Sequence, residues 1–195
     1  MKSNVRRTVL LLIIISLVAG CGGTVEVEEV VDVPPLVVAD FDSCAGVNNL
    51  GGQMGAAYNP PDSLTESYVE EAKRGCVARL DYGISQWGAF WIKLQGVDLT
   101  PYSALTFDVR ADQQVGIPEQ IKIELKRANE VSIVYMSEIE TGWKTVSLPL
   151  TELGPTGYTA SLSSFSGMEE RVFTFEAAKS GRQGVVYLDN ITFEQ

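Results

Sequence analysis

The sequence predicts an all-β domain folded as a jelly-roll β-sandwich of two antiparallel sheets. Beyond Pro35, short segments in which apolar and polar residues alternate follow one another, and no long stretch has helical periodicity. Gly, Pro, Asn and Asp lie between these segments, as expected for turns. About ten short strands with this spacing are typical of sandwich and jelly-roll folds. An apolar fraction of 45% is enough to form one core in a chain of 195 residues.

Each expected strand in the first half combines alternation with a turn signal. Residues 36–42 begin directly after a proline pair. Residues 67–73 and 76–84 lie on either side of a Lys-Arg-Gly turn. Residues 89–95 alternate large apolar and polar side chains, and residues 104–110 follow a turn that contains a proline.

The second half continues the pattern. Residues 120–127 follow a turn with Gly and Pro, and residues 131–138 come three residues later. A glycine precedes residues 143–148. A Gly-Pro pair then separates this strand from residues 171–176, and Gly181 precedes residues 184–193, which begin with a second glycine.

Alternation also assigns the two faces of each strand. The inward apolar set is Ala78, Leu80, Tyr82, Phe90, Ile92, Leu94, Leu105, Phe107, Val109, Ile121, Ile123 and Leu125. The outward set is Arg79, Asp81, Trp91, Lys93, Asp108, Arg110, Lys122, Glu124 and Lys126. If several of these strands share a sheet, its outer face is a charged surface with an aromatic side chain. An ordinary solvated face with cross-strand ion pairs is the alternative.

The first 21 residues have the pattern of a bacterial lipoprotein signal. A basic head is followed by an apolar run over residues 9–15 and by Leu-Val-Ala-Gly-Cys at residues 17–21. The run is too short to span a bilayer, for which an uncleaved anchor helix needs about 20 apolar residues. We therefore expect cleavage after residue 20 and acylation of Cys21, with palmitate among the acyl chains.

This signal predicts the location and the domain boundaries. Gly22, rather than Asp, follows the cysteine, which in a Gram-negative cell is typical of sorting to the outer membrane, on its periplasmic or its cell-surface face. In a Gram-positive cell the protein would lie on the outer face of its one membrane. We expect a signal peptide at 1–20, an acidic tether at 21–36 that contacts the lipid bilayer only through Cys21, and a β-sandwich at 37–195.

Charge and cysteine content narrow the function further. The net charge is −10, and the leader holds three basic residues but no acidic one, so the remainder is more acidic still. Nucleic acid is therefore disfavoured as a partner.

Outside the cytosol we expect Cys44 and Cys76 to form a disulfide, with two separate buried thiols as the alternative. The absence of histidine excludes Ser-His-Asp and Cys-His catalysis.

Several segments, in this order, resemble family 11 carbohydrate-binding modules and the related CIA30-like domains. They are Val-Ala-Asp-Phe-Asp at 38–42, Asn-Asn-Leu-Gly-Gly at 48–52, the turn and strand at 96–107, Gly-Trp-Lys-Thr-Val-Ser-Leu-Pro-Leu at 142–150 and Val-Tyr-Leu-Asp-Asn-Ile-Thr-Phe at 186–193. The resemblance covers residues 37–195 and implies a galactose-binding-domain-like jelly roll. It also implies a structural Ca²⁺ where the first and last strands meet, with Asp40, Asp42 and Asp189 as candidate ligands. Alternatively, Asp189 caps a bulge, and the other two aspartates lie on an exposed edge.

In family 11 modules a glycan lies across one sheet between aromatic and polar side chains, so the resemblance implies a similar site here. The candidate ligand-binding residues are Arg79, Asp81, Trp91, Lys122, Glu124 and Tyr135. Further aromatic candidates are Tyr58, Tyr68 and Trp87, whereas Trp143 and Tyr102 match positions that resemble core residues. Because most of the candidate residues are charged, a charged sugar or a protein surface is as suitable a ligand as a neutral glucan.

The favoured hypothesis is a non-catalytic, lipid-anchored module that binds a glycan at the cell envelope. The resemblance to CIA30-like domains leaves a second function open, namely a protein-interaction module in an envelope complex. The third is a glycosidase, for which Asp81, Asp108 and Glu124 could supply two carboxylates. The sequence has no glycosidase signature, and we expect no enzyme activity.

Overall fold

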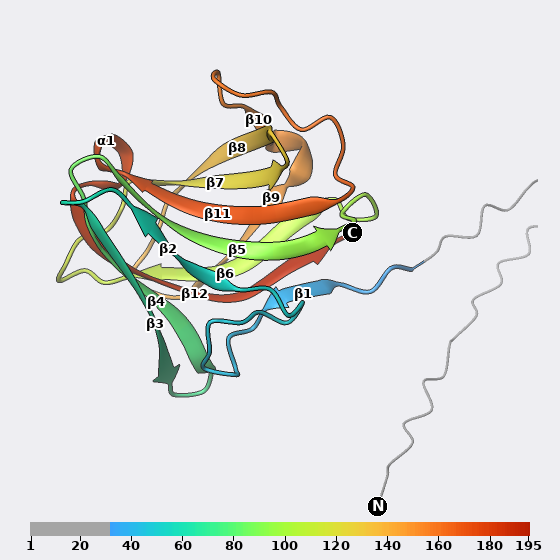
Figure 1. Ribbon diagram of the computed structural model, residues 1–195. Coiled ribbons are helices and arrows are strands. Elements are labelled where there is room, and N and C mark those ends of the chain that lie inside the picture. Colours follow the sequence, from blue (N-terminus) through green and yellow to red (C-terminus); the bar gives the residue numbers. More distant parts are fainter. Residues whose placement is uncertain (1–31) are drawn as a thin grey trace, which may run out of the picture. The chain divides into compact units, whose positions relative to one another are not determined.

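The computed structural model describes residues 32–195, and within them strands dominate (Figure 1). The predicted signal at 1–20 and its Cys21 lie outside the described residues. The elements are β1 Leu36–Ala39, β2 Met54–Tyr58, β3 Ser63–Glu71, β4 Gly75–Gly83, β5 Trp87–Val97, β6 Ala104–Ala111, β7 Gln120–Arg127, β8 Glu130–Ser137, β9 Lys144–Pro149, a 3₁₀ turn Leu150–Glu152, β10 Gly154–Pro155, β11 Met168–Glu176, α1 Ala177–Ser180 and β12 Gln183–Glu194. All ten predicted strands are present, and β2 and β10 were not predicted.

The strands form two six-stranded antiparallel sheets that face each other. Sheet 1 has the order β3-β4-β12-β6-β9, with β1 also paired to β12. Sheet 2 has the order β10-β8-β7-β11-β5-β2. Figure 1 shows β8, β7, β11, β5 and β2 following one another from top to bottom. The predicted all-β sandwich is confirmed.

The core lies between the sheets and is made by the inward positions that alternation predicted. Phe107 of sheet 1 meets Phe173 of sheet 2 edge to face, with ring centroids 5.3 Å apart. Tyr82 stacks on Phe175 at 4.5 Å and donates its hydroxyl hydrogen to the backbone oxygen of Ser180 at 2.7 Å. Such aromatic pairs join the two sheets and add to the burial of apolar area.

Cys44 and Cys76 form the expected disulfide. Their Cα atoms lie 5.5 Å apart, and the bond closes a loop with a sequence separation of 32. It fastens the segment after β1 to the beginning of β4. By restricting the unfolded chain, such a bond stabilises the fold.

Arg171 is the exception to the apolar core. It precedes Phe173 by two residues on β11, so alternation points its side chain inward, where it is 0% exposed. Its guanidinium carbon lies 4.0 Å from the ring centroid of Phe173 and 4.9 Å from that of Phe107. Among the described residues, none of its three side-chain nitrogens has a hydrogen-bond partner. Burial lowers the pKa of Arg171 well below its usual value.

Candidate functional site

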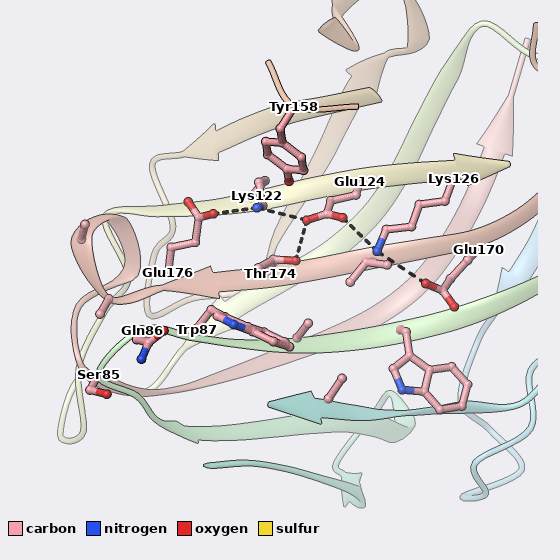
Figure 2. Close-up of a pocket in the computed structure, with 16 residues that line it drawn as sticks. Ser85, Gln86, Trp87, Lys122, Glu124, Lys126, Tyr158, Glu170, Thr174 and Glu176 are labelled. Carbon is pink, nitrogen blue, oxygen red and sulfur yellow. Dashed lines mark hydrogen bonds and ion pairs between the residues drawn. The ribbon is translucent and has the colours of Figure 1, made fainter. Parts of the chain in front are cut away.

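A pocket with a volume of about 670 Å³ lies on the outer face of sheet 2. Three adjacent strands, β7, β11 and β5, form its floor (Figure 2). The turn before β5 and the loop that carries Tyr158 contribute its walls. This volume is in the range of small-molecule binding pockets.

Strand register places the polar side chains of the floor next to one another. Lys122, Glu124 and Lys126 alternate along β7 and point outward. On β11, Thr174 lies opposite Lys122, and Glu170 lies opposite Lys126. The same strand pairs with β5, where Val172 lies opposite Trp91. The floor is therefore built on three hydrogen-bonded strands, which hold it rigidly.

The charged side chains of the floor form one continuous row. Lys122 Nζ lies 2.6 Å from a carboxylate oxygen of Glu176 and 3.2 Å from one of Glu124. Glu124 contacts Lys126 Nζ at 3.0 Å, and Lys126 contacts Glu170 at 3.6 Å. The hydroxyl of Thr174 donates to Glu124 at 2.9 Å. Figure 2 shows the row as a chain of dashed contacts.

Glu124 and Lys122, which lie side by side in the row, are both ionised at neutral pH. Burial alone would raise the pKa of Glu124, but the ammonium groups of Lys126 and Lys122 outweigh burial and lower it. Burial alone would likewise lower the pKa of Lys122, but its hydrogen bond to Glu176 and the charge of Glu124 raise it. Every charge of the row thus has an opposite charge beside it, and Glu170 is also paired with Lys93 at 2.5 Å.

Aromatic side chains border this row. Trp87 and Trp91 point outward from the same face of β5, and both line the pocket. Tyr158 is 72% exposed and lies on the side of the row opposite Trp87 in Figure 2. Tyr135 lies opposite Lys122 on β8 and donates its hydroxyl hydrogen to Glu176 at 2.8 Å. The pocket thus places the apolar faces of aromatic rings next to polar groups that are held in fixed positions.

Asp62 holds the turn that positions Trp87. Its carboxylate accepts hydrogen bonds from the hydroxyl and backbone N–H of Ser85, at 2.6 and 2.7 Å. It also accepts the backbone N–H groups of Gln86 and Trp87, at 2.8 and 3.0 Å. The hydrogen bonds from Ser85, followed by those from the next two residues, lower the pKa of Asp62 to about 2. The wall of the pocket is therefore anchored before any ligand binds.

The structure brings together only part of the predicted ligand-binding set. Trp91, Lys122 and Glu124 line the pocket, and Tyr135 lies beside it. Arg79 and Asp81 are on β4 of sheet 1, on the other side of the sandwich, where they form an ion pair with each other at 2.9 Å. The expectation that all six residues share one surface is wrong, because alternation assigns a face of a strand but not the sheet to which that strand belongs.

Several lining residues were absent from the predicted set. They are Trp87, Lys126, Tyr158, Glu170, Thr174 and Glu176. Trp87 and Lys126 were recognised as an aromatic candidate and an outward residue, respectively. The remaining residues reach the pocket only because β11 lies between β7 and β5 and because the loop after β10 folds over the sheet. Neither the strand order nor the path of this loop can be read from a short stretch of sequence.

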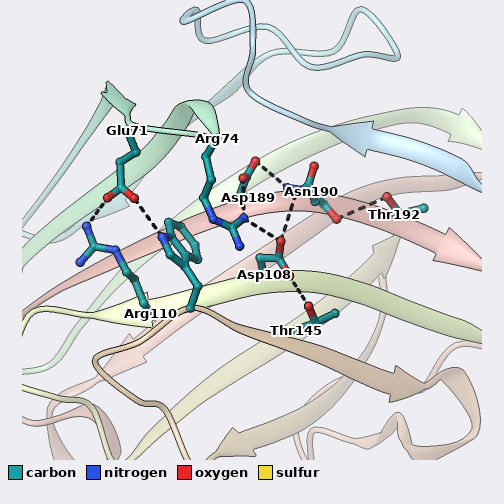
Figure 3. A network of polar contacts seen from close by, with 9 residues as sticks. Glu71, Arg74, Asp108, Arg110, Thr145, Asp189, Asn190 and Thr192 are labelled. Carbon is teal, nitrogen blue, oxygen red and sulfur yellow. Dashed lines mark hydrogen bonds and ion pairs between the residues drawn. The ribbon is translucent and has the colours of Figure 1, made fainter.

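A second polar network covers the outer face of sheet 1 (Figure 3). Arg74 Nη1 lies 2.8 Å from a carboxylate oxygen of Asp108 and 2.9 Å from one of Asp189. Its guanidinium also lies over the ring of Trp143, 4.2 Å from the centroid. Glu71 accepts the indole N–H of Trp143 at 2.9 Å and pairs with Arg110. Trp143 is therefore half-buried on the outer face of sheet 1, beneath the guanidinium of Arg74, and is not the core residue that the resemblance implied. Tyr102 packs against the core, as expected.

The three aspartates of the predicted calcium site do not fit a common ion. Asp189 is already paired with the guanidinium of Arg74, which it shares with Asp108. Asp40 instead accepts hydrogen bonds from the side chain of Asn49 at 2.7 Å and from the backbone N–H of Asp42 at 3.2 Å. Across residues 32–195, no three His, Cys, Asp or Glu side chains are grouped so that they could hold a metal ion. Calcium binding by the domain stays a prediction.

The three carboxylates considered for a glycosidase lie on two different sheets. Asp81 and Asp108 are on sheet 1, and each is paired with an arginine. Glu124 is on sheet 2 and faces outward on the opposite side. It can therefore form a catalytic pair with neither of them.

Comparison with known families identifies the domain. A family model described as carbohydrate binding domain 30 matches residues 53–195. The chain belongs to this family. The matched region begins just before β2 and contains every residue that lines the pocket, while β1 precedes it. Among curated proteins, none matches the chain.

Solved structures show the same fold. The family 11 carbohydrate-binding module of a cellulosomal cellulase of Clostridium thermocellum has a TM-score of 0.66 and 14% identity, over 83% of this chain and 95% of the module. A family 11 module from that organism, in complex with a β-1,3-1,4-mixed-linked tetrasaccharide, also has a TM-score of 0.66 and 14% identity, over 82% and 95%. A family 29 module complexed with mannohexaose has a TM-score of 0.55 and 15% identity, over 82% and 90%. The predicted resemblance to family 11 modules is confirmed.

Proposed function

We propose that this domain binds a glycan in the sheet 2 pocket. The observation that carries the proposal is the combination of Trp87, Trp91 and Tyr158 with a fixed row of charged side chains. Aromatic rings stack on the apolar faces of sugar rings, while charged and amide groups hydrogen-bond the hydroxyls. The oligosaccharides bound by the family 11 and family 29 modules support this assignment.

The proposed ligand is a neutral oligosaccharide or polysaccharide. The lysines of the pocket are paired with its glutamates, so the floor offers hydrogen bonds but no excess positive charge. The chain as a whole carries a net charge of −10, which repels anionic glycans. The charged sugars that the sequence left open are therefore less favoured than neutral ones.

We propose that the domain is not catalytic. A glycosidase needs a carboxylic acid whose pKa is raised so that it can protonate the leaving group. The pKa of Glu124, the most buried carboxylate of the floor, is lowered instead. Its neighbours Glu170 and Glu176 are engaged by lysines. The site is arranged to hold a glycan and leave it unchanged.

Glycan affinity should rise with the number of sugar units. Trp87 and Trp91 are four residues apart on one strand, which corresponds to a spacing of about 13 Å. A single sugar ring cannot contact both indoles, whereas a longer chain can. We expect affinity to rise by about tenfold or more from the disaccharide to the tetrasaccharide. Calorimetric titration of the purified chain with neutral gluco- and manno-oligosaccharides measures this.

Uronic-acid oligosaccharides of equal length are the matched control and should bind more weakly. Equal affinities for a monosaccharide and a tetrasaccharide would contradict an extended site. If no glycan binds and a protein from the cell envelope co-purifies in stoichiometric amount, the protein-interaction hypothesis replaces the proposed function.

We further propose that acylated Cys21 holds the domain at the bacterial cell envelope, with the outer membrane as the favoured location. The leader sequence supports this. Between residues 32 and 195 the chain has no helix with the length and apolarity to cross a bilayer. Cells grown with labelled palmitate should label the wild-type chain and not Cys21→Ser. Equal labelling of the two, or a mature chain that begins at Met1, would contradict the anchor.

A further inference from the structure

Gly55 of the edge strand β2 lies directly beneath the indole of Trp91. The two residues are register partners across the β2–β5 ladder. A Cβ atom placed on Gly55 would lie 2.6 Å from Cζ2 of Trp91, and 3.1 and 3.3 Å from Cε2 and Cη2. Contacts under 3.0 Å are not tolerated, so any other residue at this position would displace the ring.

The backbone does not explain a glycine here. Gly55 is not among the residues with positive φ, and it lies inside a regular strand. Glycine weakens a strand relative to alanine, and within strands it often marks a place where another group approaches closely. The approaching group in this case is the ring of Trp91. The missing side chain is therefore used to seat an aromatic residue of the pocket.

A second contact fixes the same ring. Its indole Nε1–H donates to the backbone oxygen of Ala56 at 3.3 Å. Both contacts come from β2: the ring packs over the backbone of Gly55, and its N–H is fixed by the backbone oxygen of Ala56. Because β2 is the last strand of sheet 2, the seated indole extends the pocket to the edge of the sheet.

We propose that Gly55 is a positioning residue for glycan binding and that it acts through Trp91. This inference rests on the proposed function of the pocket. A sugar ring stacks only on an indole with a defined orientation, and Gly55 sets that orientation. The residue itself offers no side chain to the ligand, so the whole of its effect on affinity passes through the ring.

The test is Gly55→Ala, with Gly142→Ala as the matched control because a Cβ there meets nothing within 4 Å. We expect Gly55→Ala to fold, because the partly exposed indole can move aside, and to lose about tenfold in affinity for a neutral tetrasaccharide. The control should keep full affinity. In a Trp91→Ala background, Gly55→Ala should change affinity no further. A Gly55→Ala variant that binds as tightly as wild type would overturn the inference.

A readout without ligand separates this inference from the proposed function. The chain has three tryptophans, and Trp91→Phe assigns the indole N–H resonance of Trp91. Gly55→Ala should shift that resonance and leave the other two in place. If it does so and the wild type binds no glycan, the proposed function fails, while the finding that Gly55 sets the orientation of Trp91 stands. An unshifted resonance overturns the positioning role whatever binds.

Discussion

Replacing Arg171 with methionine should stabilise the domain by about 1–4 kcal/mol in free energy of unfolding. The guanidinium is fully buried, and its nitrogens have no hydrogen-bond partner within the part of the chain that the structure describes. Desolvation of an unpaired charge costs several kcal/mol. Stacking on Phe173 and Phe107 recovers only part of this, because a desolvated cation–π contact contributes about 2 kcal/mol. Methionine is similarly long, flexible and apolar, so it can fill the space without the charge.

Urea denaturation at neutral pH measures the change, and the denaturant slope should stay constant. Arg182→Met is the control, because this arginine is exposed and its replacement should change stability by no more than about 0.5 kcal/mol. If Arg171→Met instead destabilises the domain by 1 kcal/mol or more, the guanidinium is satisfied in solution by groups such as buried waters. Arg171→Met would then have removed a favourable interaction.

Much of the fold could be predicted because alternation is a local property. Phe90, Ile92 and Leu94 on β5 were assigned inward from their spacing of two, and all are buried. β2 was not predicted, because Met-Gly-Ala-Ala-Tyr has few strand-forming residues and becomes a strand only by pairing with β5. Arg171 obeys the same alternation as Phe173, although nothing in its residue type predicts burial.

The site could be predicted only in part because its residues meet through strand order. The period of two assigned Trp91, Lys122 and Glu124 to outer faces correctly. It could not show that β11 would lie between β5 and β7, nor that β4 would join the other sheet with Arg79. Strand neighbours are set by long-range packing of the whole core. A correct set of outward residues was therefore distributed over two opposite surfaces.

Trp91→Ala should reduce affinity for a neutral tetrasaccharide by about 30-fold or more, the loss of about 2 kcal/mol typical of a binding hot spot. Its indole packs over Gly55 and donates a hydrogen bond to the backbone oxygen of Ala56, so little conformational entropy is lost when a sugar ring stacks on it. Trp87→Ala should have a similar effect, since the hydrogen bonds to Asp62 fix the turn that carries it. Calorimetry and quenching of tryptophan fluorescence measure both losses.

Arg79→Ala is the decisive comparison for these two variants. The sequence placed Arg79 and Trp91 on one predicted surface, whereas the structure places them on opposite sides of the sandwich. We therefore expect Arg79→Ala to bind with wild-type affinity and to lose a half-exposed ion pair with Asp81, which contributes little to stability. A loss of binding in Arg79→Ala, with full binding in Trp91→Ala, would move the glycan site from sheet 2 to sheet 1. Loss in the two tryptophan variants alone would assign it to the pocket on sheet 2.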